Sequence, residues 1–309
     1  MDSILSLKGL HKQYEKVTAL HSIDLEIPRG TVFGLLGPNG AGKTSMIRMI
    51  THITMPDAGS LSFQFNNKSI KDPMNNIGYL PEERGLYPEM KIGEQLKFFA
   101  QMKGLSSKES EQNMNYWLER MDMKDWVSKK AQELSKGMQQ LVQFVTCVIH
   151  KPELLILDEP FSGLDPINSE RLKKEIIQLS KEGKTIIFST HQMGQVEEMC
   201  DEIALINKGK IILEGDLKEI KNHFKKGVFE IRYNGTFPAE KTIDGFEIVQ
   251  EAQGHAFISC LHQCSYSTLL KTLSDYVEIY SFTEILPSLH EIFIEQVTLA
   301  KEKAEAINE

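Results

Sequence analysis

The chain has 309 residues, of which 41% are hydrophobic and 25% charged, values typical of a folded globular protein of about two domains. Its 35 basic and 43 acidic side chains give a formal net charge of −8, which argues against a broad nucleic-acid surface. No apolar run approaches the roughly 18 residues of a transmembrane helix. Residues 1–10 show no signal pattern, so we expect a cytoplasmic chain.

Strand-like and helix-like stretches alternate over about the first 215 residues. Buried strands are expected at residues 31–36, 153–157 and 185–188, with helices from residue 42 and over 167–181. Apolar strands that alternate with helices predict a mostly parallel α/β sheet. Between residues 92 and 150 the strand patterns stop, which predicts a helical insertion.

Beyond residue 216 the pattern changes. Strands are expected at residues 227–233, 256–260 and 277–282, with helices over 266–274 and from Pro287 to about residue 297. We therefore predict two domains. Residues 1–216 form the first, with a helical subdomain over about residues 86–150, and residues 217–309 form a small α+β domain.

A phosphate-binding pattern lies between the first buried strand and its helix. The run Gly37-Pro38-Asn39-Gly40-Ala41-Gly42-Lys43-Thr44, followed by Ser45, matches Gly-x-x-x-x-Gly-Lys-Ser/Thr. Glycines let successive N–H groups converge on a phosphate, and the helix N-terminus adds its positive end. Lys43 is predicted to reach the outer phosphates and Thr44 to bind Mg²⁺. Because strand and helix flank the pattern, a chance glycine-rich turn is disfavoured.

A second buried strand ends in two adjacent carboxylates, Asp158 and Glu159. Asp158 is predicted to hold Mg²⁺. Because side chains alternate along a strand, Glu159 is expected to point the other way. Glu159 is a candidate general base for an attacking water.

Three further motifs follow one another along the chain, and a single aromatic residue precedes the phosphate loop. Leu134-Ser135-Lys136-Gly137-Met138-Gln139-Gln140 resembles the Leu-Ser-Gly-Gly-Gln signature of ABC ATPases, and Ser162-Gly163-Leu164-Asp165 resembles their D-loop. Ser189-Thr190-His191 is similar to their histidine switch, and Tyr14 lies where the family carries an aromatic. Over about residues 3–216 the chain thus resembles an ABC transporter ATP-binding subunit. The resemblance implies a P-loop NTPase fold of ABC type with a helical subdomain.

The resemblance also implies the roles of several residues. Tyr14 would stack on adenine, although an ordinary strand aromatic is the alternative. His191 would contact the γ-phosphate and orient the water. Ser135 and Gly137 would meet the nucleotide of a second subunit, so two cassettes would close two ATP sites with ATP and Mg²⁺ as cofactors.

The sequence departs from the family pattern at three positions. Lys136 replaces the first glycine of the signature and either adds charge near the partner's phosphates or points to solvent. Met138 replaces the terminal glutamine and removes an amide. Glu82 aligns with the glutamine that normally follows proline in the glutamine loop, where a carboxylate can still ligate Mg²⁺.

The resemblance further implies that a separate membrane permease is the partner. In the family, the groove between the glutamine loop and the helical insert receives a permease helix; here it falls in residues 84–102. Leu86, Tyr87, Phe98 and Phe99 are the apolar candidates, although Phe98 and Phe99 also fit a helical core. The tail is similar to that of sodium-efflux and drug-export ATPases, which favours export. We therefore expect peripheral attachment at the cytoplasmic face of the membrane.

Two other functions are compatible with the motifs. A soluble ABC ATPase could act on ribosomes or DNA, but ribosomal members usually carry two cassettes, and the acidic charge disfavours nucleic acid. A regulatory module could hold ATP without hydrolysing it, which the pair Asp158 and Glu159 together with His191 disfavours. The substrate resides mainly in the permease, so these residues do not identify it.

Overall fold

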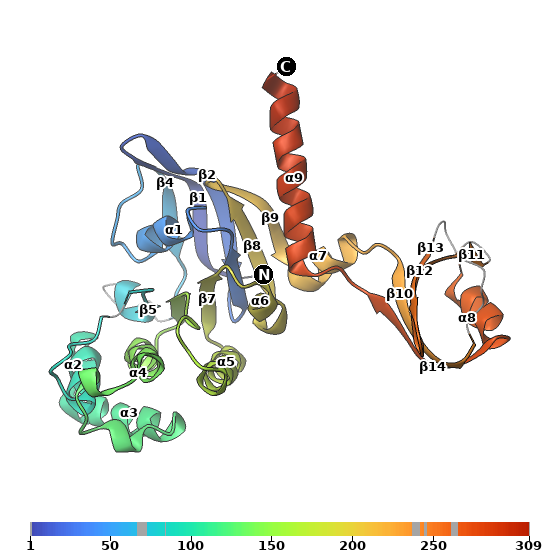
Figure 1. The fold of residues 1–309 in the computed structure, drawn as a ribbon. Helices are drawn as coiled ribbons and strands as arrows, with labels where there is room; N and C mark the ends of the chain where they lie inside the picture. The colour runs from blue at the N-terminus through green and yellow to red at the C-terminus, as the bar shows by residue number, and fades with distance from the viewer. Residues whose placement is uncertain are drawn as a thin grey trace. The chain divides into compact units, whose positions relative to one another are not determined.

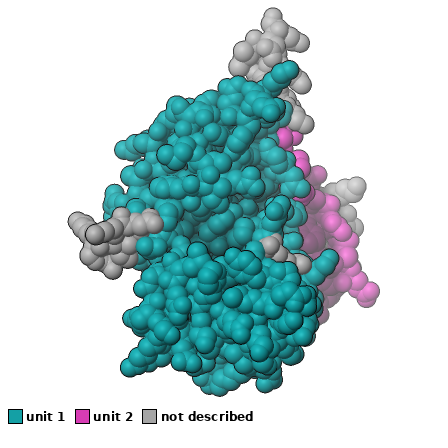
Figure 2. Space-filling view, turned by 90° about the vertical axis from the view of Figure 1, so that its left-hand side faces the viewer, with its two compact units in different colours: residues 1–217 teal, residues 218–309 magenta. Residues whose placement is uncertain are grey.

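A computed structural model describes residues 2–66, 73–83, 85–236, 242–243, 246–260 and 265–308 of the chain. The side chains of residues 242–243, 260 and 300–308 are outside this description. The chain divides into two units, residues 1–217 and residues 218–309, which Figure 2 colours separately. The sequence-based prediction places this division after residue 216. Each unit is described by itself.

A six-stranded sheet forms the centre of unit 1 (Figure 1). Its order is β5-β6-β7-β3-β8-β9, and all neighbours are parallel except β8 and β9. Every residue of β3, β6 and β7 is buried, as expected for strands covered on both faces. The strands are β3 (Val32–Leu36), β5 (Ile77–Leu80), β6 (Leu154–Asp158), β7 (Thr185–Thr190), β8 (Glu202–Asn207) and β9 (Lys210–Asp216).

The register of this sheet brings three strand ends to one edge. Leu36 of β3 pairs with Thr190 of β7, and Asp158 of β6 pairs with Ser189 of β7. Ligands of open α/β sheets bind outside the carboxyl ends of the strands. The phosphate loop, the two carboxylates and His191 therefore meet at this edge.

A second, antiparallel sheet of unit 1 comprises β1 (Ser3–Tyr14), β2 (Val17–Pro28) and β4 (Ala58–Phe63), in the order β2-β1-β4. Apolar side chains of β1 and β2 share one buried core with α1 (Lys43–Ile50) and the central sheet. The predicted elements did not include these three strands.

Three helices form the insertion between β5 and β6, and α4 packs against β5 (Figure 1). The insertion follows the expectation of a segment without strands, apart from one isolated bridge between Lys91 and Lys130. Ser106 and Glu109 form a capping box at the start of α3. The helices are α2 (Ile92–Met102), α3 (Ser107–Arg120) and α4 (Lys136–Val148), with 3₁₀ turns at Pro73–Asn76, Lys124–Trp126 and Ala131–Glu133.

Helix α5 (Pro166–Lys181) begins at the N-cap Asp165, whose carboxylate accepts from the backbone N–H groups of Ile167 and Asn168. Proline at the first helical position supports this start. Helix α6 (Met193–Met199) follows β7. Among the helices that the structure describes, none is long and apolar enough to span a bilayer.

Unit 2 contains a five-stranded antiparallel sheet in the order β11-β12-β13-β10-β14. Helix α8 contributes Leu269 and Leu273 to its core, beside Ile231 and Ile258 of the sheet. The elements are α7 (Leu217–His223), β10 (Val228–Gly235), β11 (Thr242–Ile243), β12 (Phe246–Ala252), β13 (His255–Cys260), α8 (Tyr266–Ser274), β14 (Val277–Ile285) and α9 (Leu289–Asn308).

The last helix differs from its predicted bounds. Helix α9 begins after Ser288 and not at Pro287, because the Ser288 hydroxyl accepts from the N–H of Glu291 while the Glu291 carboxylate accepts from the N–H of Ser288. It also continues beyond residue 297 to Asn308, through a run rich in Lys, Glu and Ala, which are strong helix formers.

Candidate functional site

The phosphate loop lies between β3 and α1, as the sequence predicts. Two of its glycines cannot carry a side chain without displacing the backbone. A Cβ on Gly37 would lie 2.2 Å from the carbonyl oxygen of Ile206, and one on Gly42 would lie 2.6 Å from that of Ala19. Both residues also have positive φ, 148° and 115°. The loop thus packs tightly against β8 and β2.

Lys43, the first residue of α1, folds back over the loop. Its ammonium donates to the carbonyl oxygens of Gly37 at 2.7 Å and Pro38 at 3.1 Å. The residue is only 7% exposed, and burial lowers its pKa, while the nearby carboxylates of Glu159, Asp158 and Glu82 oppose this change. A buried cation among these groups is suited to bind an anion.

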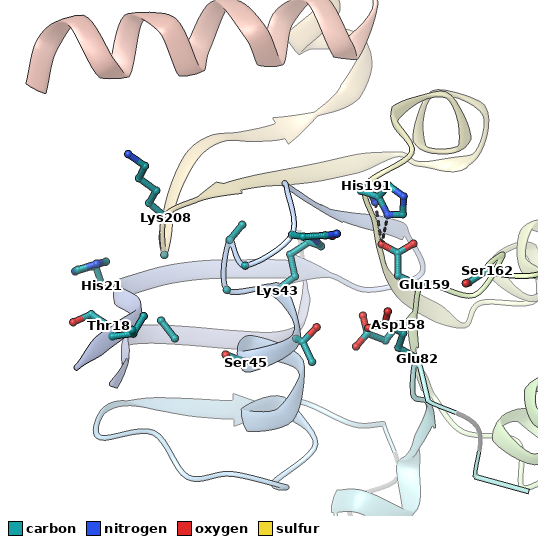
Figure 3. A pocket seen from close by; sticks show the side chains of 18 residues that line it. Thr18, His21, Lys43, Ser45, Glu82, Asp158, Glu159, Ser162, His191 and Lys208 are labelled. Carbon is teal, nitrogen blue, oxygen red and sulfur yellow. Dashed lines mark hydrogen bonds and ion pairs between the residues drawn. The ribbon is translucent and has the colours of Figure 1, made fainter. Parts of the chain in front are cut away.

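A cavity of about 600 Å³ opens beside the loop (Figure 3). This volume lies within the range of nucleotide-sized ligand pockets. The cavity combines the loop with residues from β2, the β8–β9 turn and the ends of β6 and β7. It is lined by Val17, Thr18, Ala19, His21, Asn39, Gly40, Ala41, Gly42, Lys43, Thr44, Ser45, Glu82, Asp158, Glu159, Ser162, His191, Lys208 and Gly209.

Asp158 is almost wholly buried at the end of β6, with 2% exposure. Burial raises the pKa of its carboxyl, against the hydrogen bond from the Ser189 hydroxyl, and the charge of Glu159 raises it further. Its Oδ2 is buried and has no hydrogen-bond partner among the described residues. This free oxygen, beside the Thr44 hydroxyl, fits a Mg²⁺ ion, which prefers oxygen ligands.

Glu159 lies directly after β6 in the left-handed region, with φ of 48°. The Nδ1 of His191 is 2.7 Å from its Oε1, and the backbone N–H of His191 donates to the same oxygen at 3.1 Å (Figure 3). The Thr190 hydroxyl donates to Oε2 at 3.3 Å. Three donors at the end of β7 thus fix the carboxylate, which is 13% exposed.

The prediction that Glu159 points away from Asp158 was wrong. Alternation applies within a strand, but β6 ends at Asp158 and the positive φ of Glu159 turns the chain. Both carboxylates therefore line the same cavity. Their proximity contributes to the raised pKa of Asp158.

Glu82 reaches the cavity from the loop that follows β5. It is exposed, and Figure 3 shows it beside Asp158. The neighbouring Glu83 is tied to the insertion, because the side-chain amide of Gln143 on α4 donates to its carbonyl at 3.2 Å. The loop that carries Glu82 is therefore linked to the helical subdomain. Arg84 lies outside the described residues.

Tyr14 lies at the rim and not in the lining. It ends β1 and pairs with Val17, which does line the cavity. Its side chain is 38% exposed, and the ammonium of Lys12 is 5.4 Å from the ring centroid. Its stacking on adenine stays a prediction.

Ser135 and Gly137 lie at the start of α4, apart from the lining of this cavity in the described part of the chain. Ser135 is the exposed N-cap and accepts from the N–H of Met138 at 3.2 Å. A Cβ on Gly137 would lie 3.5 Å from the carbonyl oxygen of Gly163 in the D-loop motif. Lys136 is exposed and Met138 half-buried. Ser135 and Lys136 therefore present an open face near the D-loop, whereas Gly137 is buried.

Sequence reasoning missed several contributors. Ser189 and Thr190 belong to a motif in which only His191 received a role, yet they hold Asp158 and Glu159. Their position at the end of a strand parallel to β6 was the available signal. Thr18, His21 and Lys208 also line the cavity, and their sequence contexts carry no motif that would identify them.

The sequence of this chain is similar to the sequences of known proteins. A family model described as ABC transporter matches residues 20–162, and one described as ATP-binding protein DrrA1-3-like, C-terminal domain, matches residues 215–297. The chain is 42% identical to the uncharacterized ABC transporter ATP-binding protein YhaQ of Bacillus subtilis, over 95% of this chain and 98% of that protein. It is 34% identical to the Nod factor export ATP-binding protein I of Ralstonia nicotianae, over 78% and 75%.

A solved structure described as the ATP binding subunit of an ABC transporter matches with a TM-score of 0.66 and 30% identity. The match covers 72% of this chain and 93% of that one. Together with the sheets described above, this likeness confirms the predicted fold class, an ABC-type P-loop NTPase with a helical subdomain and a C-terminal α+β domain.

Proposed function

The chain belongs to the ABC transporter ATP-binding proteins and is an ATPase of that family, and on this premise we propose that it uses Glu159 as the general base and drives a separate permease, in the export direction. The observation that carries the chemical part is the set of three hydrogen bonds that hold the Glu159 carboxylate in the same cavity as Lys43 and Asp158.

In this proposal the phosphate loop, Glu159 and His191 have separate roles. The phosphate loop and Lys43 bind the triphosphate, with Lys43 exchanging its carbonyl partners for phosphate oxygens. Glu159 takes the proton of the attacking water, because a positioned carboxylate can act as the base. His191, 55% exposed beside Glu159, orients that water and contacts the γ-phosphate.

We assign the Mg²⁺ ligands to Thr44 and Asp158, with Glu82 as a third. The buried free oxygen of Asp158 supports this assignment. When bound, the ion would neutralise charge on the phosphates. Glu82 would contribute a carboxylate where the family has an amide.

The position of the signature supports dimer formation. Ser135 and Lys136 are exposed, and Ser135 and Gly137 are not part of this chain's own nucleotide cavity as described. A helix N-terminus attracts phosphate. We therefore propose that they complete the site of a second cassette, identical or different.

An aromatic cluster supports permease docking. Tyr87 is 52% exposed and Phe98 37%, and the Tyr87 ring lies 6.0 Å from Phe98 and 6.1 Å from Phe99. The buried amide of Gln95 fixes the loop by accepting from the N–H and donating to the carbonyl of Tyr87. Contiguous exposed apolar clusters often mark interaction sites. Phe99 is half-buried, so it serves partly as core.

Export is proposed from relatives, one of which is named for Nod factor export. The permease would place the chain at the cytoplasmic face of the membrane. The experiment is affinity purification of the tagged full chain from detergent-solubilised cells. We expect a polytopic membrane protein to copurify. Ribosomes or DNA in its place would favour the non-transport alternative and contradict the proposal.

A matched pair of variants localises the contact. Phe98→Asp should release the membrane protein while leaving nucleotide binding intact, because the Phe98 ring lies outside the nucleotide cavity. Met55→Asp, at a residue that is 72% exposed elsewhere on unit 1, should retain it. Equal retention by both variants would remove the aromatic cluster from the docking surface.

A further inference from the structure

A second cavity, of about 490 Å³, lies in unit 1 at the opposite end of the central sheet from the nucleotide site. Its walls come from α3, from α5 and from the segment that joins α4 to β6. Leu155 and Lys184 place it at the starting ends of β6 and β7, whose other ends carry Asp158 and Thr190. None of the motifs described above contributes to it.

One side of this cavity is apolar. Val148, Leu155 and Leu179 are buried at its wall, with exposures of 2%, 1% and 4%. Trp117 adds a large ring that is 3% exposed, and Tyr116 stands edge-on to it at 5.5 Å and is 49% exposed. Such walls suit a flat apolar ring.

The other side carries cations. The positive charge of Arg120 is already paired, since its guanidinium is 2.5 Å from Glu175 of α5 and 3.0 Å from Glu182, the C-cap of that helix. Lys184 is different: its ammonium donates only to the backbone carbonyl of Lys151, at 3.3 Å. Lys151 also lines the cavity. Neither Lys151 nor Lys184 has a carboxylate within ion-pair distance of its ammonium among the residues that the structure describes.

The two lysines also repel each other. Burial lowers the pKa of Lys184, and the charge of Lys151 lowers it further, against the attraction of Glu153 and Glu182. A half-buried ammonium without an anionic partner is costly, and a bound anion would remove that cost. The cavity therefore presents unmatched positive charge beside an apolar wall.

We propose that this cavity is a binding site for a small molecule that carries one carboxylate on a flat apolar ring system. The carboxylate would lie against Lys184 and Lys151, and the ring against Trp117 and its apolar neighbours. An inorganic anion would lack contacts with the apolar wall, and a neutral ring would leave the lysines unpaired.

The test is calorimetric titration of the full chain with sodium 2-naphthoate, with MgADP kept saturating so that the nucleotide cavity is filled. We expect one molecule bound per chain. The neutral 2-naphthylmethanol and inorganic phosphate should each bind at least about tenfold more weakly, because each forms only one of the two kinds of contact.

Two lysine variants distinguish naphthoate binding in this cavity from binding elsewhere on the protein. Lys184→Gln should weaken naphthoate binding about tenfold or more, as expected for the loss of one hydrogen bond to a charged group. Lys174→Gln, on α5 but outside the cavity and with a side chain that is 75% exposed, should leave binding within about twofold of the parent.

A fluorescence titration provides an independent readout. The chain has two tryptophans, so Trp126→Phe leaves Trp117 as the only reporter. Its emission should change with the dissociation constant found by calorimetry. No naphthoate binding, equal binding of the neutral ring, equal effects of Lys184→Gln and Lys174→Gln, or binding that leaves Trp117 emission unchanged would each overturn the proposal.

Discussion

Lys43→Ala tests the phosphate site. Lys43 is 7% exposed and is the cation whose ammonium lies against the phosphate loop, 2.7 Å from the Gly37 carbonyl oxygen. When a triphosphate occupies the cavity, this ammonium is expected to bind its outer oxygens. The alanine variant keeps the loop and helix but loses that cation.

The expected loss follows from the contacts. A hydrogen bond to a charged group contributes about 1.5–3 kcal/mol, and the ammonium can reach two phosphates. A loss of about 3 kcal/mol or more corresponds to nucleotide binding weakened roughly a hundredfold or more. The assay is calorimetric titration with MgATP and MgADP.

The fold should be unaffected or slightly stabilised. Because burial lowers the pKa of Lys43, its charge opposes folding at neutral pH, and this penalty disappears as pH rises past the lowered pKa toward the ordinary value. The Pro38 carbonyl still accepts from the N–H of Ala41, at 3.1 Å. Thermal unfolding without nucleotide should therefore occur no earlier than in the parent at pH 7.

Lys208→Asn is the matched control. Lys208 lines the same cavity but is exposed, and its φ of 47° suits asparagine. It should change nucleotide affinity by no more than about threefold, as expected for a solvated charge. If folded Lys43→Ala binds nucleotide as tightly as Lys208→Asn, the assignment of the phosphate loop is refuted.

Three further predictions concern metal binding, domain independence and stability. Glu82→Gln should raise the Mg²⁺ concentration for half-maximal ATPase activity, because a carboxylate ligand is lost; an unchanged requirement would place Glu82 outside the coordination shell. A chain ending at Leu217 should bind ATP as tightly as the full chain in calorimetry, since every lining residue of the cavity precedes that point; a folded truncation that cannot bind would contradict this. Arg120→Met should lower the free energy of unfolding in urea by about 2–4 kcal/mol at pH 7, because Glu175, with a side chain that is 11% exposed, loses its cation. Burial raises the pKa of Glu175, so the loss should shrink as pH falls through that pKa, and a loss that grows on acidification would refute this reasoning.

The sequence predicted the site best where chemistry constrains residue type and order together. Gly37 and Gly42 are fixed by close backbone approach, and Asp158 by the end of a fully buried strand. Such constraints leave local patterns that can be read without long-range information. The helices predicted over residues 167–181 and 266–274 lie at Pro166–Lys181 and Tyr266–Ser274, and they could be predicted because caps and periodicity are local.

Features that depend on distant parts of the chain were missed. The direction of Glu159 depends on donors from β7, thirty or so residues away, and on a positive φ that alternation does not foresee. Strands β1 and β2 mix buried and exposed residues irregularly because bulges shift their register. Strand β12 is largely exposed, so it lacks an apolar run.

The central claim, that Glu159 is the base of an ATP-hydrolysing cassette, is tested most directly by the turnover of Glu159→Gln. The amide keeps an oxygen that can accept from the N–H of His191, but it cannot take a proton from water. Phosphate release should fall about a hundredfold or more, while MgATP affinity measured on the same preparation stays within a fewfold of the parent. A folded variant that binds ATP and hydrolyses it at the parent rate would contradict the account.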